Sequence, residues 1–509
     1  MPATTRGPRL LEQRKDMGMD AQVIVVGAGP AGLMLAGELR LAGVEVVVLE
    51  RLAEPTGESR GLGFTARTLE VFDQRGLLSG LGDIEITDLG HFGGLPVDFS
   101  ILGPAHSGGV KGVPQAVTET MLEKWAVELG ADIRRGHELL ALGDEGEYVE
   151  VEVATPEGPR RLRADYLVGC DGGRSTVRKA AGFDFPGTDP TMEMYLADVR
   201  DCDITPRMIG ETVPGGMVMA GPLGNGVHRI IVCERGTPPR RRDQPPSWEE
   251  VSSAWQRLTG QDISGGTPVW LSAFGNPARL VTQYRRGRVL LAGDAAHIHL
   301  PAGGQGMNTS IQDAVNLGWK LAATVNGTAP EGLLDTYHAE RHPVGRRLLM
   351  NTQAQGLLFL SGAEMQPLRE VMSELITFDN VSRHLAGMVS GLSIKYELGP
   401  GEHPLMGLRV PHVELVGESG RTSTTELLHP ARGVLLDLAD DDALRAAVEP
   451  WSDRVDVVTA VVHGPADGNP LAPADAILVR PDGHVAWTAP GPVPPAEALA
   501  RSFGAPRSR

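Results

Sequence analysis

The sequence predicts an α/β (α+β) protein with a Rossmann-like domain, because three glycine-rich segments follow one another in a fixed order. They are GAGPAG at 27–32, DGGRSTVR at 171–178 and GDAAHIHLPAGGQGMN at 293–308. Each segment alone is weak evidence, since glycine turns are common. The ordered set indicates a flavin-binding enzyme.

The first segment lies within a predicted βαβ unit. An apolar run at 23–26 precedes it, a helical stretch follows at 31–41, and a second apolar strand is predicted at 44–49. This order places the glycines at the turn between strand and helix, where dinucleotide-binding folds hold phosphates.

Each glycine of this turn has a predicted task. Gly27 allows the tight turn, Gly29 lets the backbone approach a pyrophosphate, and Gly32 permits close packing of the helix on the strand. Glu50 ends the second strand, where an acid would hold ribose hydroxyls. The unit predicts a dinucleotide without deciding which one.

The third segment favours FAD over NAD. Asp294 closes an apolar strand at 289–292, and the run 301–308 leads into a helix predicted at 309–325. An acid at a strand end can bond a sugar-alcohol chain, and a helix N-terminus stabilises negative charge on a reduced flavin ring. A nicotinamide enzyme has no need of this second site.

At these residues the chain resembles the class A FAD-dependent aromatic hydroxylases of the p-hydroxybenzoate hydroxylase type, from about residue 20 to residue 509. It is more similar still to the polyketide hydroxylases of angucycline biosynthesis in the gaudimycin, landomycin and jadomycin pathways. The carrying segments are ESRGLGFTARTLEVFDQRG at 58–76, GHFGGLPVDF at 90–99, PGTDPTMEMYLADV at 186–199, PGGMVMAGPL at 214–223 and NTQAQGLLFLSG at 351–362.

The resemblance implies FAD as cofactor and a role for individual residues. Glu50 and Arg51 match the ribose side, Arg60 the pyrophosphate side, Gln115 the ring-facing glutamine and Asp294 the ribityl ligand. The full predicted FAD set is Gly27, Gly29, Pro30, Ala31, Gly32, Glu50, Arg51, Arg60, Gln115, Asp171, Asp294, Pro301, Gly303, Gly304, Gln305, Gly306, Met307 and Asn308.

The resemblance also implies a reaction that consumes NADPH and O2 through a flavin C4a-hydroperoxide. No second Rossmann unit is evident, so NADPH would visit transiently. In the family the second segment touches both cofactors, which makes Arg174 and Arg178 candidates for NADPH contact, beside Asp171. The alternative is that this segment only closes a turn and that Arg178 is a surface charge. No protein acid or base is assigned to catalysis.

Small and flexible residues predict a pocket for a broad apolar polycycle. The favoured function is hydroxylation of an angucycline-type polyketide in antibiotic biosynthesis, at C12 of a prejadomycin-like tetracycle. Two alternatives stay open: a Baeyer–Villiger oxygenase of a polycyclic ketone, and a non-catalytic flavin-binding interaction protein. The candidate substrate residues are Phe92, Gly93, Gly94, Gly215, Gly216, Met217 and Met219.

Composition and residue spacing argue against nucleic acid, membrane and metal ions as partners. A net charge of −17 argues against nucleic acid or an anionic membrane surface. The three cysteines lie far apart, and His297 and His299 have no carboxylate or cysteine at ligand spacing, so we expect no metal site and read the two histidines as a flavin wall. No apolar stretch reaches membrane-spanning length. We expect a cytoplasmic protein.

The pattern along the chain predicts five segments. The last of them lacks cysteine, so thioredoxin-type redox chemistry is excluded and we read it as structural or dimer-forming. The segments are a disordered leader at 1–19, the first part of the FAD domain at 20–183, a substrate-binding β-sheet domain at 184–277, the second part of the FAD domain with long helices at 278–400, and a thioredoxin-like domain at 401–509.

Overall fold

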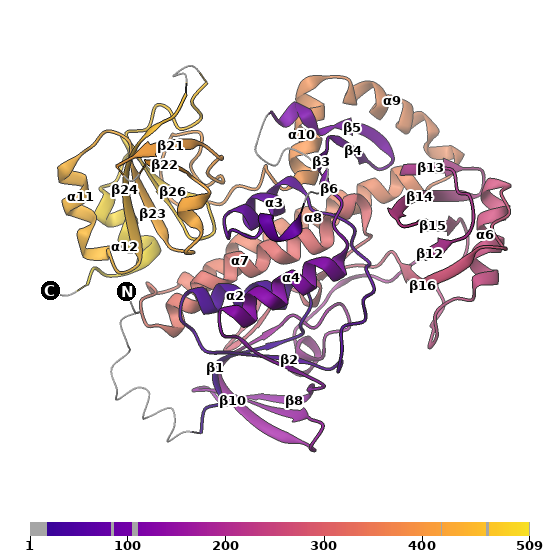
Figure 1. The fold of residues 1–509 in the computed structure, drawn as a ribbon, viewed down its shortest axis with the longest axis horizontal. Coiled ribbons are helices and arrows are strands. Elements are labelled where there is room, and N and C mark those ends of the chain that lie inside the picture. The colour runs from indigo at the N-terminus through magenta and orange to yellow at the C-terminus, as the bar shows by residue number, and fades with distance from the viewer. Residues whose placement is uncertain (1–17, 83–85, 104–109, 419, 465–467, 508–509) are drawn as a thin grey trace.

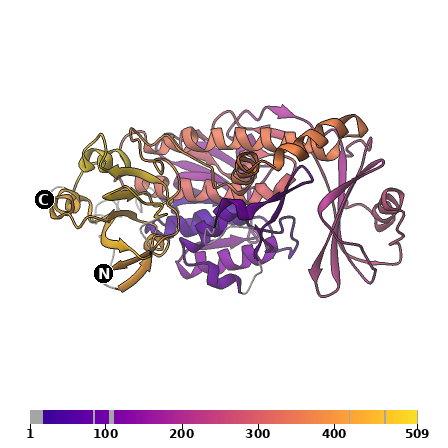
Figure 2. The same cartoon turned by 90° about the horizontal axis from the view of Figure 1, so that it is seen from above.

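The computed structural model describes residues 18–82, 86–103, 110–418, 420–464 and 468–507. Three main sheets follow one another along an elongated molecule, as Figures 1 and 2 show, with the Rossmann-like sheet in the middle. This mixed architecture confirms the predicted fold class. The predicted leader at 1–19 lies outside the described residues except for its last two, and the predicted domain boundaries stay a prediction.

The central sheet has the strand order β18-β19-β10-β1-β2-β7, in which every neighbouring pair from β19 to β7 is parallel. Parallel strands are covered on both faces, which is why β1 and β2 read as nearly unbroken apolar runs. The strands are β1 (Ala21–Val26), β2 (Val46–Glu50), β7 (Asp132–Arg135), β10 (Arg160–Gly169), β18 (Arg285–Arg286) and β19 (Val289–Leu291).

An antiparallel extension continues the sheet beyond β10. It consists of β8 (Glu138–Asp144) and β9 (Val149–Ala154), and β9 pairs with β10. Strand β10 runs without a break, and its first half pairs with β9 while its second half pairs with β1.

Three helices cover one face of this sheet: α2 (Pro30–Leu41), α4 (Gln115–Glu128) and α7 (Gln305–Val325). Helix α7 is buried along almost its whole length. It begins four residues earlier than predicted, because Gly303 and Gly304 have φ of 68° and 66° and complete the loop before it. Helix α8 (Thr336–Leu360) packs on α7 and reaches toward the five-stranded sheet (Figure 2).

Among the long helices predicted within 278–400, the segment after α8 forms two helices, α9 (Gln366–Ile376) and α10 (Asp379–Ser390). Phe378 between them has extended backbone, with φ of −83° and ψ of 125°, and this breaks the helix. Helix α10 packs on the small hairpin of β4 (Leu89–Phe92) and β5 (Leu95–Asp98).

The five-stranded sheet is antiparallel, in the order β13-β14-β15-β12-β16. Helix α6 (Trp248–Thr259), which the sequence analysis did not predict, buries Trp255 against one face. Its N-terminus is a capping box of Ser247 and Glu250. The strands are β12 (Glu193–Arg200), β13 (Arg207–Val213), β14 (Gly216–Gly224), β15 (Val227–Glu234) and β16 (Thr267–Gly275).

The C-terminal unit is a six-stranded sheet with helices α11 (Asp442–Val448) and α12 (Pro495–Phe503). Its order is β22-β21-β24-β23-β25-β26, and only β23 and β24 are parallel. This is the thioredoxin-like arrangement that the sequence predicted. The strands are β21 (Glu414–Gly417), β22 (Gly420–Ser423), β23 (Gly433–Asp437), β24 (Val455–Val462), β25 (Ala476–Val479) and β26 (Val485–Ala489).

Within the described ranges, no helix has both the length and the apolar character needed to cross a membrane.

Candidate active site

Four parallel strands of the central sheet end at the same edge, and each delivers one predicted residue there. Gly27 follows β1, Glu50 ends β2, Asp171 follows β10 and Asp294 follows β19. Strand β1 lies between β10 and β2. Ligands of open α/β sheets bind at the carboxyl ends of the strands where such neighbours diverge, so this edge is the candidate site.

The glycine turn after β1 is built by two close approaches. A Cβ at Gly27, where φ is 104°, would lie 2.5 Å from the carbonyl oxygen of Cys170, and a Cβ at Gly32 would overlap the carbonyl of Gly27. Gly32 therefore packs helix on strand, as its position predicted. At Gly29 a Cβ would meet no protein atom within 4 Å. The turn is thus closed toward the sheet and open at Gly29, the N-cap residue of α2.

Glu50 stabilises this turn through its carboxylate. Its Oε2 accepts a hydrogen bond from the backbone N–H of Ala28 at 2.9 Å, and its Oε1 accepts one from Leu52 at 2.9 Å. Each carboxylate oxygen can accept a further bond, so a sugar hydroxyl could still be held. Arg51 beside it is exposed.

Arg60 and Gln115 lie beside the loop that precedes α7. The Oε1 atom of Gln115 accepts from the N–H of Gly61 at 3.2 Å, and its Nε2 donates to Glu119 at 2.8 Å. A Cβ at Gly61 would be 3.4 Å from the methyl carbon of Met307. The exposed Arg60 is one residue away. The structure thus brings segments separated by about 250 residues in the sequence to one place.

Asp171 accepts hydrogen bonds at the start of the short helix α5 (Thr176–Ala180), whose N-cap residue is Ser175. Its Oδ2 accepts from the N–H groups of Thr176 at 2.7 Å and Val177 at 3.1 Å, and its Oδ1 accepts from the Ser175 hydroxyl at 2.5 Å. The second segment therefore does close a turn. This does not exclude cofactor contact, because Asp171 remains half-buried at the candidate edge.

The two arginines of the second segment differ in their surroundings. Arg178 is buried and donates to the carbonyls of Ala295 at 2.9 Å and Gly173 at 2.8 Å, with its guanidinium over the Phe185 ring. It is not a surface charge, and it ties the second segment to the residue after Asp294. Arg174 is exposed.

Asp294 combines an exposed side chain with dense protein surroundings. Desolvation raises the pKa of its carboxyl, while His297 and Arg60 act in the opposite direction. A group that water reaches but that protein atoms surround on most sides lies in a concave part of the surface. This is where a ribityl ligand would be needed.

A glycine is the N-cap residue of both α2 and α7. Gly304 is the N-cap of α7, and neither α2 nor α7, both fully described, has a side-chain cap. A Cβ at Gly304 would meet no protein atom within 4 Å. The first N–H groups of a helix carry a partial positive charge, so both helix ends suit an anionic ligand. Pro301 is exposed at the start of the loop 301–304, which precedes α7.

Two buried amides hold the loop in shape. Asn308 accepts from the N–H of Thr65 at 2.9 Å and donates to the carbonyls of Gly63 at 3.1 Å and Gly304 at 2.8 Å. Gln305 accepts from the side-chain amide of Asn351 at 2.8 Å. The predicted residues 305–308 therefore join α7 to the segment after β2 and to α8.

The two histidines of the third segment have different environments. His297 is fully buried and its Nε2 lies 2.8 Å from Asp313, so it belongs to the core and does not form part of an open wall. His299 is half-buried next to Gly306. Burial and the nearby His297 lower the pKa of His299 to about 4, and its Nδ1 donates to the carbonyl of Leu300 at 2.7 Å. A neutral ring with Nδ1 protonated leaves Nε2 as an acceptor.

The predicted substrate residues fall into two groups. A Cβ at Gly93 would be 2.8 Å from Leu358, and one at Gly94 would be 2.8 Å from Phe359, so both glycines let the β4–β5 hairpin approach the end of α8. Phe92 packs on Leu358 within the same region.

Met217 and Met219 join an apolar cluster that connects the five-stranded sheet to Leu300 and Phe359. Gly215 and Gly216, in contrast, lie against Leu258 of α6. Gly216 also lies against the backbone of Cys233, and the proposed contact of both glycines with substrate stays a prediction.

Two family models match the chain. One, described as an FAD binding domain, matches residues 20–352, and the other, described as aromatic-ring hydroxylase, C-terminal, matches residues 403–506. The chain belongs to the FAD-dependent aromatic-ring hydroxylases.

Relatives of this hydroxylase support the same conclusion. The 12-dehydrotetracycline 5-monooxygenase/anhydrotetracycline 6-monooxygenase of Streptomyces rimosus is 47% identical over 486 residues, which cover 92% of this chain and 96% of the relative. CabE, an aromatic hydroxylase from angucycline biosynthesis, is 70% identical with a TM-score of 0.93, over 96% of this chain and all of CabE. BexE, studied for oxidation during BE-7585A biosynthesis, is 63% identical with a TM-score of 0.91, over 96% of this chain and all of BexE. The predicted resemblance is confirmed.

The sequence analysis missed a buried polar network below the site of the hydroxylase. Its members include Arg341, Glu340, Tyr396 and Arg480, together with Asp313 of α7. The sequence offered a signal for Arg480, a charge directly after the apolar run 476–479, but none for Glu340 and Arg341, whose neighbours are mostly polar. Among the described residues, no group of three or more His, Cys, Asp or Glu side chains is placed to hold a metal ion.

Proposed function

We propose that this hydroxylase oxygenates an aromatic ring of an angucycline-type polyketide, at C12 of a prejadomycin-like tetracycle, in antibiotic biosynthesis. The observation that carries the proposal is the 70% identity to CabE over nearly the whole chain. The similarity covers 96% of this chain, and we propose that the segments 90–99, 214–223 and 351–362 form the substrate wall. NADPH supplies electrons and O2 the oxygen atom.

FAD fits the edge of the central sheet. Gly29 at the N-terminus of α2 would hold the pyrophosphate, Glu50 and Arg51 the ribose, and Asp294 the ribityl chain, while the N-terminus of α7 would stabilise charge on the ring. When bound, the flavin supplies oxygen-transfer chemistry, and the protein supplies position and exclusion of water. Arg60, Gln115 and the loop 301–308 complete the proposed contacts.

The substrate wall joins the flavin loop to the five-stranded sheet. Leu300 and Ala302 of the loop share an apolar cluster with Met217, Phe359 and Leu360. Apolar, flexible side chains suit a flat polycycle, because they adapt to its shape and keep water out. Phe92, Gly93 and Gly94 continue this wall from the β4–β5 hairpin.

Turnover by the purified protein tests the proposal. NADPH oxidation is measured with and without an aromatic tetracycle such as prejadomycin, and the product structure is determined by NMR. A new ring hydroxyl at C12 is the expected result. An inserted ester oxygen would move the assignment to the Baeyer–Villiger alternative. Failure of NADPH to bleach bound FAD under all conditions would favour the non-catalytic flavin-binding alternative.

A further inference from the structure

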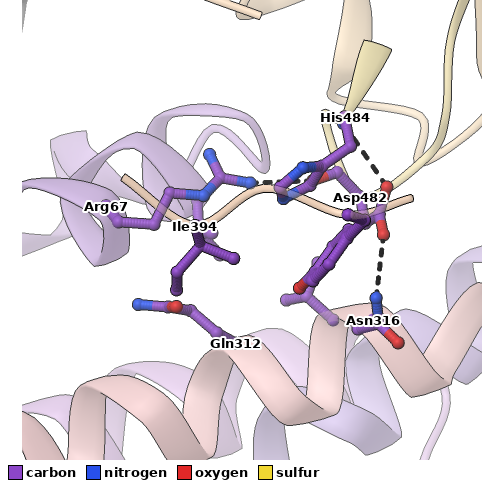
Figure 3. Close-up of a pocket in the computed structure, with 9 residues that line it drawn as sticks. Arg67, Gln312, Asn316, Ile394, Asp482 and His484 are labelled. Atoms are coloured by element: carbon purple, nitrogen blue, oxygen red, sulfur yellow. Dashed lines mark hydrogen bonds between the residues drawn. The ribbon is translucent and has the colours of Figure 1, made fainter. Parts of the chain in front are cut away.

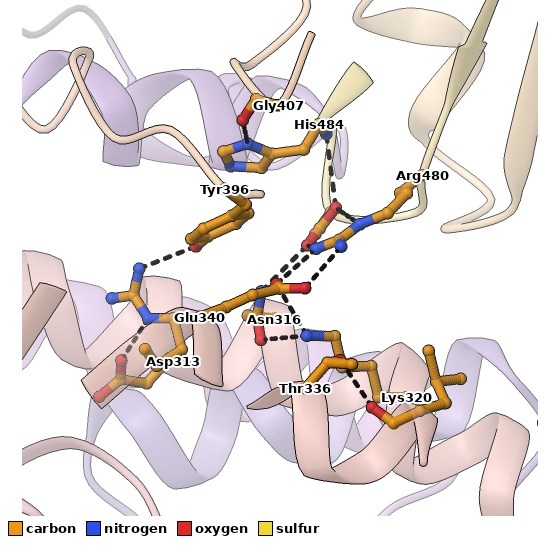
Figure 4. A network of polar contacts seen from close by, with 12 residues as sticks. Asp313, Asn316, Lys320, Thr336, Glu340, Tyr396, Gly407, Arg480 and His484 are labelled. Carbon is orange, nitrogen blue, oxygen red and sulfur yellow. Dashed lines mark hydrogen bonds and ion pairs between the residues drawn. The ribbon is translucent and has the colours of Figure 1, made fainter. Parts of the chain in front are cut away.

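The turn between β25 and β26, residues 480–484, lies against α7 and α8 (Figure 4). Arg480 donates to both carboxylate oxygens of Glu340 at 2.8 Å and also contacts Asp482. Lys320 of α7 donates to Glu340 at 2.8 Å. All these side chains are buried. The C-terminal unit is therefore attached through buried charges to α7, called the flavin helix below because its N-terminus is proposed to face the flavin ring.

A second set of contacts runs from the same turn toward the candidate site. The ring of His484 stacks on that of Tyr396, with 4.2 Å between centroids, and its Nδ1 lies 3.0 Å from the carbonyl of Gly407. The Tyr396 hydroxyl accepts from Arg341 Nη1 at 3.0 Å. Tyr396 itself lies in the segment that links α10 to the C-terminal unit.

Arg341 links Tyr396 to α7 through two hydrogen bonds. Its Nε donates to Asp313 Oδ1 at 2.6 Å, and its Nη2 donates to the carbonyl of Thr309 at 3.2 Å. Asp313 Oδ2 accepts from the backbone N–H of Gly293 at 3.2 Å and lies 2.8 Å from His297 Nε2. The contacts therefore end on the residue directly before Asp294 and in the second turn of the flavin helix.

The charge of the buried Asp313 strengthens these hydrogen bonds. Burial by itself raises the pKa of Asp313, but Arg341 and His297 outweigh it and lower that pKa, so the carboxylate stays charged. Charge-assisted hydrogen bonds in a low-dielectric interior are the stronger kind and depend on geometry. The pocket between His484, Tyr396 and Gln312 has a volume of only about 10 Å³, room for about one water molecule (Figure 3). The contact between the C-terminal unit and α7 therefore has little space in which to shift.

We propose that Asp313, Arg341, Tyr396 and His484 form a positioning relay, through which the C-terminal unit orients Asp294 and thereby sets the affinity for FAD. The proposal rests on the proposed role of Asp294 as a ribityl ligand. Asp294 has an exposed side chain, so its direction depends on the backbone before it. That backbone is anchored at Gly293, whose N–H is bonded to Asp313. The relay residues are positioning residues, because none of them lies at the exposed edge.

Tyr396→Phe is the sharpest test, because it removes only the hydroxyl that accepts from Arg341. We expect the Kd for FAD, measured by flavin fluorescence, to rise by roughly 3- to 10-fold, the effect of one lost hydrogen bond. We also expect a changed visible circular dichroism of bound FAD. The matched control is Trp451→Phe, which removes the buried bond from Trp451 Nε1 to the carbonyl of Gly504 within the C-terminal unit. The control should lower Tm without changing either flavin readout.

A double-mutant cycle with Asp294→Asn separates the relay from general stability. If the relay acts through Asp294, Tyr396→Phe has a smaller effect on the Kd in the Asp294→Asn background. Equal effects in both backgrounds would overturn the relay, as would an unchanged Kd in Tyr396→Phe when Asp294→Asn weakens binding. An unchanged Kd in Asp294→Asn alone would refute the ribityl role instead. If Tyr396→Phe does not fold, His484→Leu, which removes the ring contact from the other side, is titrated in its place.

Discussion

At the scale of residues, environment assigns different tasks to two carboxylates that lie 19 positions apart. Asp294 is exposed at a concave edge, and desolvation raises its pKa. Asp313 is fully buried, but its pKa is lowered because Arg341 and His297 outweigh burial. The sequence analysis assigned the first as a ribityl ligand and gave the second no role. The difference arises because partners on another helix, α8, decide the state of Asp313.

Asp294→Ala should weaken FAD binding by about 1 to 3 kcal/mol, the range for a lost buried hydrogen bond. The reason is the proposed bond between its carboxylate and the ribityl chain. Equilibrium titration of the apoprotein with FAD measures the effect, and the unfolding midpoint of the apoprotein serves as the control. An unchanged FAD affinity would contradict the proposed role.

We expect substitution of Arg174 to affect NADPH binding and substitution of Arg178 to affect stability. Arg174→Ala removes an exposed cation, so we expect the Kd for NADPH to rise by roughly 2- to 10-fold without loss of stability. Arg178→Ala removes a buried guanidinium that bonds two carbonyls, so we expect a lower Tm. Stopped-flow reduction of bound FAD by NADPH and thermal unfolding separate the two. Arg200→Ala, on an exposed surface of the five-stranded sheet, is the matched control. If Arg174→Ala and this control reduce at the same rate, Arg174 does not contact NADPH.

At the scale of elements, the helices α2 and α7 bring two uncapped N-termini to one edge of the central sheet. Gly303 and Gly304 precede α7 with positive φ, whereas Gly29 precedes α2 with extended backbone. The sequence predicted α2 closely, because a proline opens it. It placed the start of α7 too late, since residues 305–308 resemble the loop in composition although they form the first turn of the helix.

Two alanine substitutions in the same turn test which side of it faces the cofactor. Gly32→Ala should destabilise the apoprotein by about 1 to 3 kcal/mol, because a Cβ there overlaps the backbone of Gly27. Gly29→Ala should cost the apoprotein less than about 1 kcal/mol, because a Cβ there meets no protein atom. It should nevertheless weaken FAD binding. Urea unfolding of the apoproteins and FAD titration give both quantities. Full FAD affinity in Gly29→Ala would disprove the placement of the pyrophosphate.

At the scale of the whole molecule, buried ion pairs hold the C-terminal unit against the flavin helix. Burial by itself raises the pKa of Glu340, but Arg480 and Lys320 outweigh it and lower that pKa from 4.5 to about 2. Because the folded pKa is lowered, the unfolded state binds more protons between these two values. The stability contributed by Glu340 is therefore fully present above pH 4.5 and is lost as pH falls toward 2.

Glu340→Gln should lower the free energy of unfolding at pH 7 by about 3 to 5 kcal/mol, because it removes the carboxylate from Lys320 and leaves Arg480 paired with Asp482 alone. It should also make the decline in stability between pH 5 and pH 3 shallower than in the wild type. Urea unfolding of both proteins across this range measures the slope. Glu497→Gln, on the exposed face of α12, should retain the wild-type slope. Parallel curves for Glu340→Gln and wild type would show that Glu340 does not titrate as described.

The sequence by itself determined the family, the Rossmann-like turn, the cofactor edge and the thioredoxin-like order of the C-terminal unit. It could do so because these features depend on local patterns: apolar runs, glycines and an acid at a strand end. Only the tertiary structure decided that Arg178 is buried, that Gly215 and Gly216 lie against α6, and that His484 reaches Asp313 through Tyr396 and Arg341. These partners lie tens to hundreds of residues apart in the chain. Their pairing depends on how three sheets and two long helices pack, which no local pattern records.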